Sequence, residues 1–290
     1  MERTLRKCLV WLCLTGMFCL FVCLPRQITA QEQEPQNVSN LVIFVKYNGD
    51  SRDVFNAEQD YVTYKVKNWD NIKKMYGPNV QHDYQSGIDY DNSFQNYIYV
   101  ISEHKVRVTS IFPQENAAGT AVNTYELQKS SYFTEGEIIG EVLRALNSGA
   151  INNEDGTFDL SQYRLNNRQN GLVDNLTIVI QGDAGQDRNN IIYPHKGQYS
   201  GQETLNGCRI FNYNILPSAV LVTDDASMGV KQAQGVIAHE FLHVLGLPDL
   251  YRGSDDGVPV GQWDTMASNS SFLQYPLSYL RAQLGWIAAS

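Results

Sequence analysis

Residues 231–251 read KQAQGVIAHEFLHVLGLPDLY, a helical pattern that stops at Gly246. His239 and His243 are four residues apart, so a helix places both imidazoles on one face, where they can meet at a single ion. Imidazole nitrogen suits zinc, which accepts a tetrahedral ligand set. Glu240 is turned away from that ion but can reach a water molecule beside it. The pattern predicts a zinc site in which Glu240 acts as the general base.

A catalytic zinc needs a third protein ligand and one open position. No Glu or His follows residue 243, so neither residue type can supply that ligand downstream. Among the four downstream aspartates, Asp249 follows His243 by six residues. Gly246 can adopt the left-handed conformation that ends a helix, and Pro248 prevents the helix from resuming. We therefore predict Asp249 as the third ligand.

The resulting spacing, H-E-x-x-H-x-x-G-x-x-D, resembles the extended metzincin pattern with aspartate as the last ligand. Metzincins also place a methionine in a turn beneath the metal. Met266, within QWDTMAS at residues 262–268, lies at a suitable distance after Asp249. A bare H-E-x-x-H can arise by chance or form a solvated helix face. The chain has only five histidines, so two of them in register with these other residues favour the metal site.

Strand and helix patterns alternate ahead of this helix. Strands are indicated at 41–47, 106–112 and 176–180, with a further one at 208–215. A helix is predicted over 91–103 with Ser93 as its cap, and another from a Thr134/Glu137 capping box to Gly149. The stretch after Gly246 shows little periodicity. These patterns predict an α/β, metzincin-like two-lobed domain, with a mixed twisted sheet and helices above the cleft and an irregular C-terminal lobe below.

The first thirty residues differ in kind from the rest. A basic start is followed by an apolar run from Cys8 to Leu24 and by a cleavage site at Ile28-Thr29-Ala30. This order predicts a signal peptide over residues 1–30 and a secreted or extracytoplasmic location. An uncleaved membrane anchor and a lipoprotein attached through Cys23 are alternatives. Residues 31–40 are polar, which predicts a disordered tail ahead of the domain at 41–290.

Removal of such a leader changes both the cysteine count and the charge. Only Cys208 remains, so core packing and any bound ions must stabilise the domain without an internal disulfide. The remainder has 18 basic and 30 acidic residues, a net charge of −12. An acidic surface without basic clusters argues against nucleic acid and anionic membranes as partners. The sequence does not indicate an oligomeric state.

Several segments resemble the immune inhibitor A-type family of secreted bacterial metallopeptidases. They are HEFLHVLGLPDLY (239–251), VGQWDTMAS (260–268) and Pro276–Ile287, with weaker similarity in Ser93–Pro113, Gly171–Gly182 and Tyr193–His195. This resemblance, over residues 41–287, implies a zinc metalloendopeptidase. It would hydrolyse protein or peptide substrates by a zinc-activated water, with zinc held by His239, His243 and Asp249. Glu240 would be the catalytic base.

One loop departs from that family's pattern. Residues 166–171 read NNRQNG where an acidic, calcium-type loop would lie, and only Asp174 is retained. Arg168 introduces a positive charge there, so Ca²⁺ is a less favoured second ion beside the catalytic Zn²⁺.

Three questions stay open at this level. A non-catalytic module with a structural zinc would need a fourth protein ligand, for which Cys208 is the one cysteine after the leader. The seventeen tyrosines suggest an adhesin or glycan-binding protein as another alternative. The donor that would stabilise the reaction's oxyanion is also unassigned, with Tyr251, Tyr275 and His195 as candidates.

Overall fold

The computed structural model describes residues 34–61, 64–77, 93–183, 192–222, 226–251, 259–268 and 274–288. The predicted signal peptide lies outside these residues. Residues 35–290 form a unit separate from the first 34 residues. Within the described residues, no helix has both the length and the apolar character needed to cross a membrane.

The described unit alternates strands and helices. Its strands are β1 (Gln36–Lys46), β2 (Glu58–Tyr61), β3 (Tyr64–Lys67), β4 (Val106–Ile111), β5 (Tyr125–Glu126), β6 (Leu176–Ile180), β7 (His195–Gln198), β8 (Thr204–Leu205), β9 (Cys208–Arg209) and β10 (Asn212–Pro217). Its helices are α2 (Asn68–Tyr76), α3 (Phe94–Ile101), α4 (Glu135–Ser148), α5 (Ser218–Leu221), α6 (Ala226–Val244) and α7 (Ser278–Gln283), with a short 3-10 turn at Leu160–Gln162.

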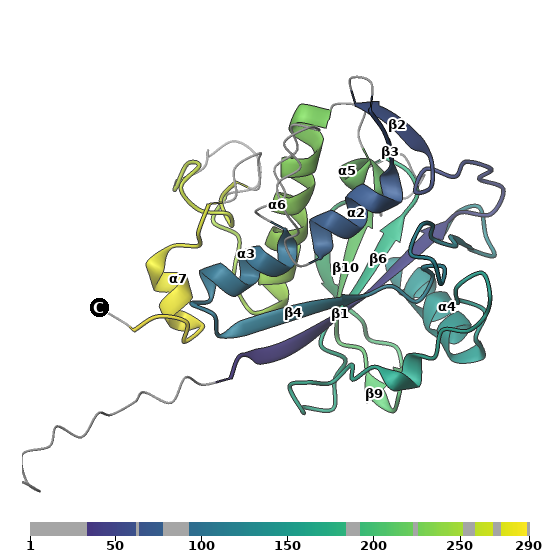
Figure 1. Ribbon diagram of the computed structural model, residues 1–290. Coiled ribbons are helices and arrows are strands. Elements are labelled where there is room, and N and C mark those ends of the chain that lie inside the picture. Colours follow the sequence, from purple (N-terminus) through teal and green to yellow (C-terminus); the bar gives the residue numbers. More distant parts are fainter. Residues whose placement is uncertain are drawn as a thin grey trace, which may run out of the picture. The chain divides into compact units, whose positions relative to one another are not determined.

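The main sheet has the strand order β4-β1-β6-β10-β7, and β5 pairs with the end of β1 (Figure 1). The strand pairs of this sheet are parallel, except that β7 runs antiparallel to β10. The predicted α/β fold with a mixed sheet is confirmed. The strand β7 is an edge of the described sheet, and it packs against α6.

Side chains that alternate along β1 divide the core into two layers. Val42 and Phe44 belong to the cluster formed with α2, α3 and α6. Leu41, Ile43 and Val45 belong to the cluster formed with α4 on the opposite face. Figure 1 shows α2, α3 and α6 on one side of the sheet and α4 on the other. Both faces of the parallel strands are therefore covered, as expected for an α/β domain.

The predicted helix signals are confirmed. The Ser93 hydroxyl accepts a hydrogen bond from the Asn96 N–H at the start of α3. Thr134 and Glu137 form the reciprocal capping box of α4, and Gly149 ends that helix with φ of 75°. These local signals needed no tertiary contact to be recognised.

The predicted tail at residues 31–40 is wrong from Gln36 onward. These residues form the first half of β1, where Gln36 pairs with Val106 of β4. Ser39 and Asn40 are buried, but their polar groups have partners: the Ser39 N–H donates to Asp174, and Asn40 Oδ1 accepts from Thr177. The polar composition therefore reflects a hydrogen-bonded strand and not a solvated tail.

The structure also differs from the prediction in the number and kind of its elements. The single strand predicted at 208–215 is two strands, β9 and β10, separated by two residues. The β2–β3 hairpin and α2 were not predicted. The described part of the C-terminal lobe contains one short helix, α7. Its Arg281 donates from Nε to the carbonyl oxygen of Ile101 at 2.8 Å and so ties this lobe to α3.

Candidate metal centre

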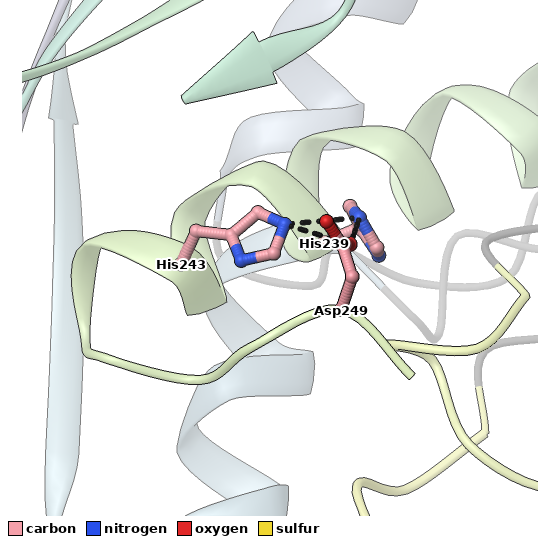
Figure 2. A group of neighbouring side chains, drawn as sticks. All are labelled: His239, His243 and Asp249. Atoms are coloured by element: carbon pink, nitrogen blue, oxygen red, sulfur yellow. Dashed lines mark hydrogen bonds and ion pairs between the residues drawn. The ribbon is translucent and has the colours of Figure 1, made fainter. Parts of the chain in front are cut away.

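The helix α6 brings the two predicted histidines together. Its buried side packs into the core through Phe241 and Leu242, and His239 is only 2% exposed. The Nε2 atoms of His239 and His243 are 3.2 Å apart. Each lies 3.1 Å from the same carboxylate oxygen, Asp249 Oδ1. Figure 2 shows these three side chains pointing toward one another.

The chain reaches this point through the turn that ends α6. Gly246 has φ of 107°, a conformation that favours glycine, and the Leu247 N–H donates back to the Leu242 carbonyl at 3.1 Å. The Leu250 N–H then donates to the Met266 carbonyl at 2.8 Å. The segment that carries Asp249 is thus held between the helix end and the methionine turn.

Backbone carbonyl groups orient both imidazoles. His239 Nδ1 lies 2.9 Å from the Thr265 carbonyl oxygen, and His243 Nδ1 lies 2.7 Å from that of Leu247. A carbonyl only accepts, so each Nδ1 carries the hydrogen and each Nε2 of a neutral ring presents a lone pair to the shared point. Burial lowers the pKa of His239 below its usual 6.5, which favours the neutral ring.

The ligand atoms fit a metal ion. Two nitrogen lone pairs and a carboxylate oxygen converge on one point, which is unfavourable without a cation between them. Tetrahedral zinc, with bonds of about 2.0–2.1 Å, would separate its ligand atoms by roughly 3.3 Å. The distances of 3.1–3.2 Å between these three atoms agree with that spacing.

Met266 is fully buried in the core cluster that includes Phe241 and Leu242, in the turn where the sequence predicts an apolar floor. Its N–H donates to Asp264 Oδ1 at 2.6 Å, and the Leu277 N–H donates to Asp264 Oδ2 at 2.6 Å. Asp264 is itself fully buried. The sequence marked it only as one of four downstream aspartates, but its carboxylate connects the methionine turn to the segment before α7.

A cleft of about 460 Å³ opens beside the three ligands. It is lined by Pro194, His195, Lys196, Glu240, His243, Gly246, Leu247, Pro248, Asp249 and Tyr251. One wall is therefore the start of the edge strand β7, and the other is the end of α6 with the turn that follows it. The start of β7 therefore borders the same cleft as Glu240, His243 and Asp249.

Glu240 lies in this cleft and is only 4% exposed. Burial raises the pKa of its carboxyl to about 7, and the charge of Asp249 acts in the same direction. The positive charge of His195 and a hydrogen bond from the Lys196 backbone N–H oppose that rise in pKa. A carboxylate with a pKa near neutrality can both take up and return a proton at physiological pH.

Of the three candidate oxyanion donors, Tyr251 is nearest the ligands. Its ring stacks on His239 with centroids 6.0 Å apart, and burial and the Asp249 charge raise the pKa of its hydroxyl to about 12. Tyr275 instead holds Arg281 over its ring, and it does not line the described cleft.

The third candidate, His195, has both ring nitrogens engaged by acceptors. Nε2 lies 3.0 Å from Glu135 Oε2, and Nδ1 lies 2.8 Å from the Tyr193 carbonyl oxygen. Burial acts to lower the pKa of His195, but the hydrogen bond and charge of Glu135 outweigh it and raise that pKa above 6.5. Tyr213 also donates to Glu135. The raised pKa favours the protonated ring, and the pair with Glu135 ties β7 to α4.

This pair predicts a pH-dependent contribution to stability. The pKa of His195 is raised in the folded protein. Its contribution to the free energy of unfolding is therefore full below pH 6.5 and is lost as the pH rises through its pKa in the folded protein. Burial acts to raise the pKa of Glu135, but the hydrogen bonds of His195 and Tyr213 lower it below 4.5. The contribution of Glu135 to the free energy of unfolding is full above pH 4.5 and is lost as the pH falls through its pKa in the folded protein.

We therefore expect Glu135→Gln to lower the free energy of unfolding by roughly 0.5–1 kcal/mol near pH 5.5, and by less near pH 9. Glutamine still accepts from Tyr213, so the difference reports on charge. Thermal unfolding of metal-free protein at both pH values measures it. An equal loss at both would show that the pair carries no charge.

Similarity to known proteins agrees with this geometry. A model of the immune inhibitor A peptidase M6 catalytic domain matches residues 50–275. The chain belongs to this family. The M6 match covers the metal-centre helix, Asp249 and the methionine turn in one alignment. A comparison with curated protein sequences gave no match.

Membership of the M6 family makes this chain a metallopeptidase that acts on proteins or peptides. The metal-ligand cluster of His239, His243 and Asp249 is the part of the described structure able to hold the metal. In the loop that departs from the family pattern, Asp174 is fully buried. Its carboxylate accepts from the N–H groups of Asn167 and Arg168, and Arg168 Nε lies 3.3 Å from Oδ1.

Proposed function

We propose that this M6 domain is a secreted zinc-dependent endopeptidase in which Glu240 is the general base. The observation that carries the proposal is the convergence of the His239, His243 and Asp249 ligand atoms beside a cleft that His243, Asp249 and Glu240 line. Zinc is the proposed ion because two imidazoles and one carboxylate suit its borderline-soft character and leave one position open. Secretion rests on the leader predicted at residues 1–30.

When bound, zinc would supply a Lewis acid that polarises the scissile carbonyl and acidifies water. The chain's own groups do the rest. Glu240 takes the proton of the attacking water and delivers it to the leaving amine, for which a pKa of about 7 is suited. The Tyr251 hydroxyl is the proposed donor to the oxyanion because Tyr251 lines the cleft, stacks on His239 and is protonated at neutral pH.

The edge strand supports a substrate bound in extended form. The strand β7 pairs with β10 on one side and borders the cleft. Lys196 of this strand and Glu240 of α6 both line that cleft. A peptide that adds to this edge by β-augmentation would bring its backbone beside the general base.

A structural zinc site completed by Cys208 has no support in the described structure. Cys208 lies on β9 and packs against the cluster around α4. The histidines come from α6, which packs on the opposite face of the sheet. We therefore favour a catalytic site over a closed structural one.

The test is cleavage of end-blocked peptides from a digested proteome by the purified secreted protein. We expect internal cleavage that stops on chelation and returns with stoichiometric zinc. End-blocked substrates exclude removal of single terminal residues. Cleavage that survives complete metal removal would overturn the proposal. Sequencing of the secreted chain's N-terminus tests the leader, with Gln31 expected as the first residue.

A further inference from the structure

We propose that Lys196 selects substrates that carry an acidic side chain close to the scissile bond. This inference rests on the proposed peptidase function and deepens it. Lys196 lies on the edge strand β7, lines the cleft and is partly buried. Its position, its direction and its charge each point to a substrate carboxylate.

The direction follows from the alternation of side chains along β7. His195 contacts Glu135 at the start of α4. Gly197 has the ring of Tyr213 so close that an added Cβ would lie 2.3 Å from it, and Tyr213 belongs to the core cluster around α4. Both residues therefore face the α4 side of the sheet. Lys196, between them, faces the opposite side, where α6 carries Glu240.

The backbone places a bound peptide next to this side chain. In an antiparallel pair, the N–H and C=O groups of one residue point to the same side of the strand. Strand β7 pairs with β10 on one side and is an edge of the described sheet, so its groups that point away from β10 are open to a peptide, and Lys196 lines the cleft at that edge. A peptide paired with that edge would place one residue opposite Lys196, on the same face, with Cβ atoms about 4.5–5.5 Å apart.

Among the described residues of the cleft, no carboxylate compensates the charge of the Lys196 ammonium. His195 is paired with Glu135, and Asp249 lies against the two histidines. Lys196 forms no ion pair with any residue in the described ranges. Glu240 lines the same cleft, but it forms no ion pair with Lys196. A substrate aspartate or glutamate opposite Lys196 would supply the missing partner.

The acidic character of the whole chain does not remove this selection. The net charge of −12 for residues 31–290 repels acidic peptides at long range. At physiological ionic strength that repulsion is screened beyond about 8 Å. A contact between the ammonium and a carboxylate inside a partly buried cleft is screened much less, so it decides which bound peptides are held in register.

The test is a cleavage-site profile on a proteome-derived peptide library, followed by kcat/KM for matched peptides that differ only as Asp or Asn at the selected position. Wild-type protein is expected to prefer the Asp peptide by about tenfold. Lys196→Arg should keep the preference, Lys196→Ala should abolish it, and Lys196→Glu should favour Lys or Arg at the same position. Lys65→Ala, exposed on β3, is the control that leaves the profile unchanged.

A binding measurement separates selection from turnover. Glu240→Ala protein should bind the Asp peptide about tenfold more tightly than the Asn peptide, and the Glu240→Ala/Lys196→Ala double variant should not discriminate. Circular dichroism checks that each variant is folded. A wild-type enzyme that cleaves in a zinc-dependent way with the same profile as folded Lys196→Ala would overturn the role of Lys196 and leave the peptidase intact. Absence of any zinc-dependent cleavage by wild type would overturn both.

Discussion

Replacement of Glu240 by alanine is expected to lower kcat by about 10²- to 10⁴-fold while the metal stays bound. The carboxyl lies in the cleft next to the ligands but is not itself a ligand, so its loss removes the proton acceptor and leaves the metal site intact. Steady-state kinetics on an end-blocked peptide, together with metal content by mass spectrometry, measure the two effects separately.

Glu58→Ala is the matched control for this variant, because Glu58 is exposed on β2 and does not line the cleft. It should change neither kcat nor metal content. A Glu240→Ala protein that loses its metal would make Glu240 a ligand. Full turnover with the metal in place would show that another group is the base.

Replacement of Asp249 by alanine is expected to release the metal. Asp249 Oδ1 is one of the three atoms that lie 3.1–3.2 Å from one another. Without it, the two imidazoles are the only protein ligands left from this cluster, and water must fill the other two positions of a tetrahedral ion. We expect the metal affinity to fall by more than the roughly 10–100-fold lost when a group that only orients a ligand is removed. Activity should fall in parallel, and excess zinc should restore it in part.

Competition titrations with a chromogenic chelator measure this affinity. Asp155→Ala, an exposed aspartate in a turn far along the chain from the metal helix, controls for the loss of one negative charge. Unchanged affinity in Asp249→Ala would exclude Asp249 as a ligand. An equal fall in both variants would attribute the effect to net charge.

The parts of this site that sequence could predict are those with a fixed local geometry. The i, i+4 spacing of His239 and His243 holds on any α-helix, and Gly246 followed by Pro248 restricts where Asp249 can go. The caps of α3 and α4 were predictable for the same reason, since each involves residues three positions apart.

The remaining features depend on contacts between distant segments. The carbonyl of Thr265 orients His239, and backbone carbonyl groups leave no signature in residue identity. Lys196 meets Glu240 only because β7 folds back antiparallel beside β10. Ser39 and Asn40 are polar residues that the sequence alone assigns to a solvated tail, because their hydrogen-bond partners, Asp174 and Thr177, are distant along the chain. Chain pairing, and not local propensity, decides each of these.

The central claim is that His239, His243 and Asp249 hold one zinc ion and leave a position open to solvent. Zinc K-edge X-ray absorption on the secreted, metal-loaded protein tests it most directly. We predict one zinc per chain with only nitrogen and oxygen neighbours, all at about 2.0–2.2 Å, and imidazole scattering from two histidines. A sulfur neighbour at about 2.3 Å, or four protein ligands around the ion, would contradict the account.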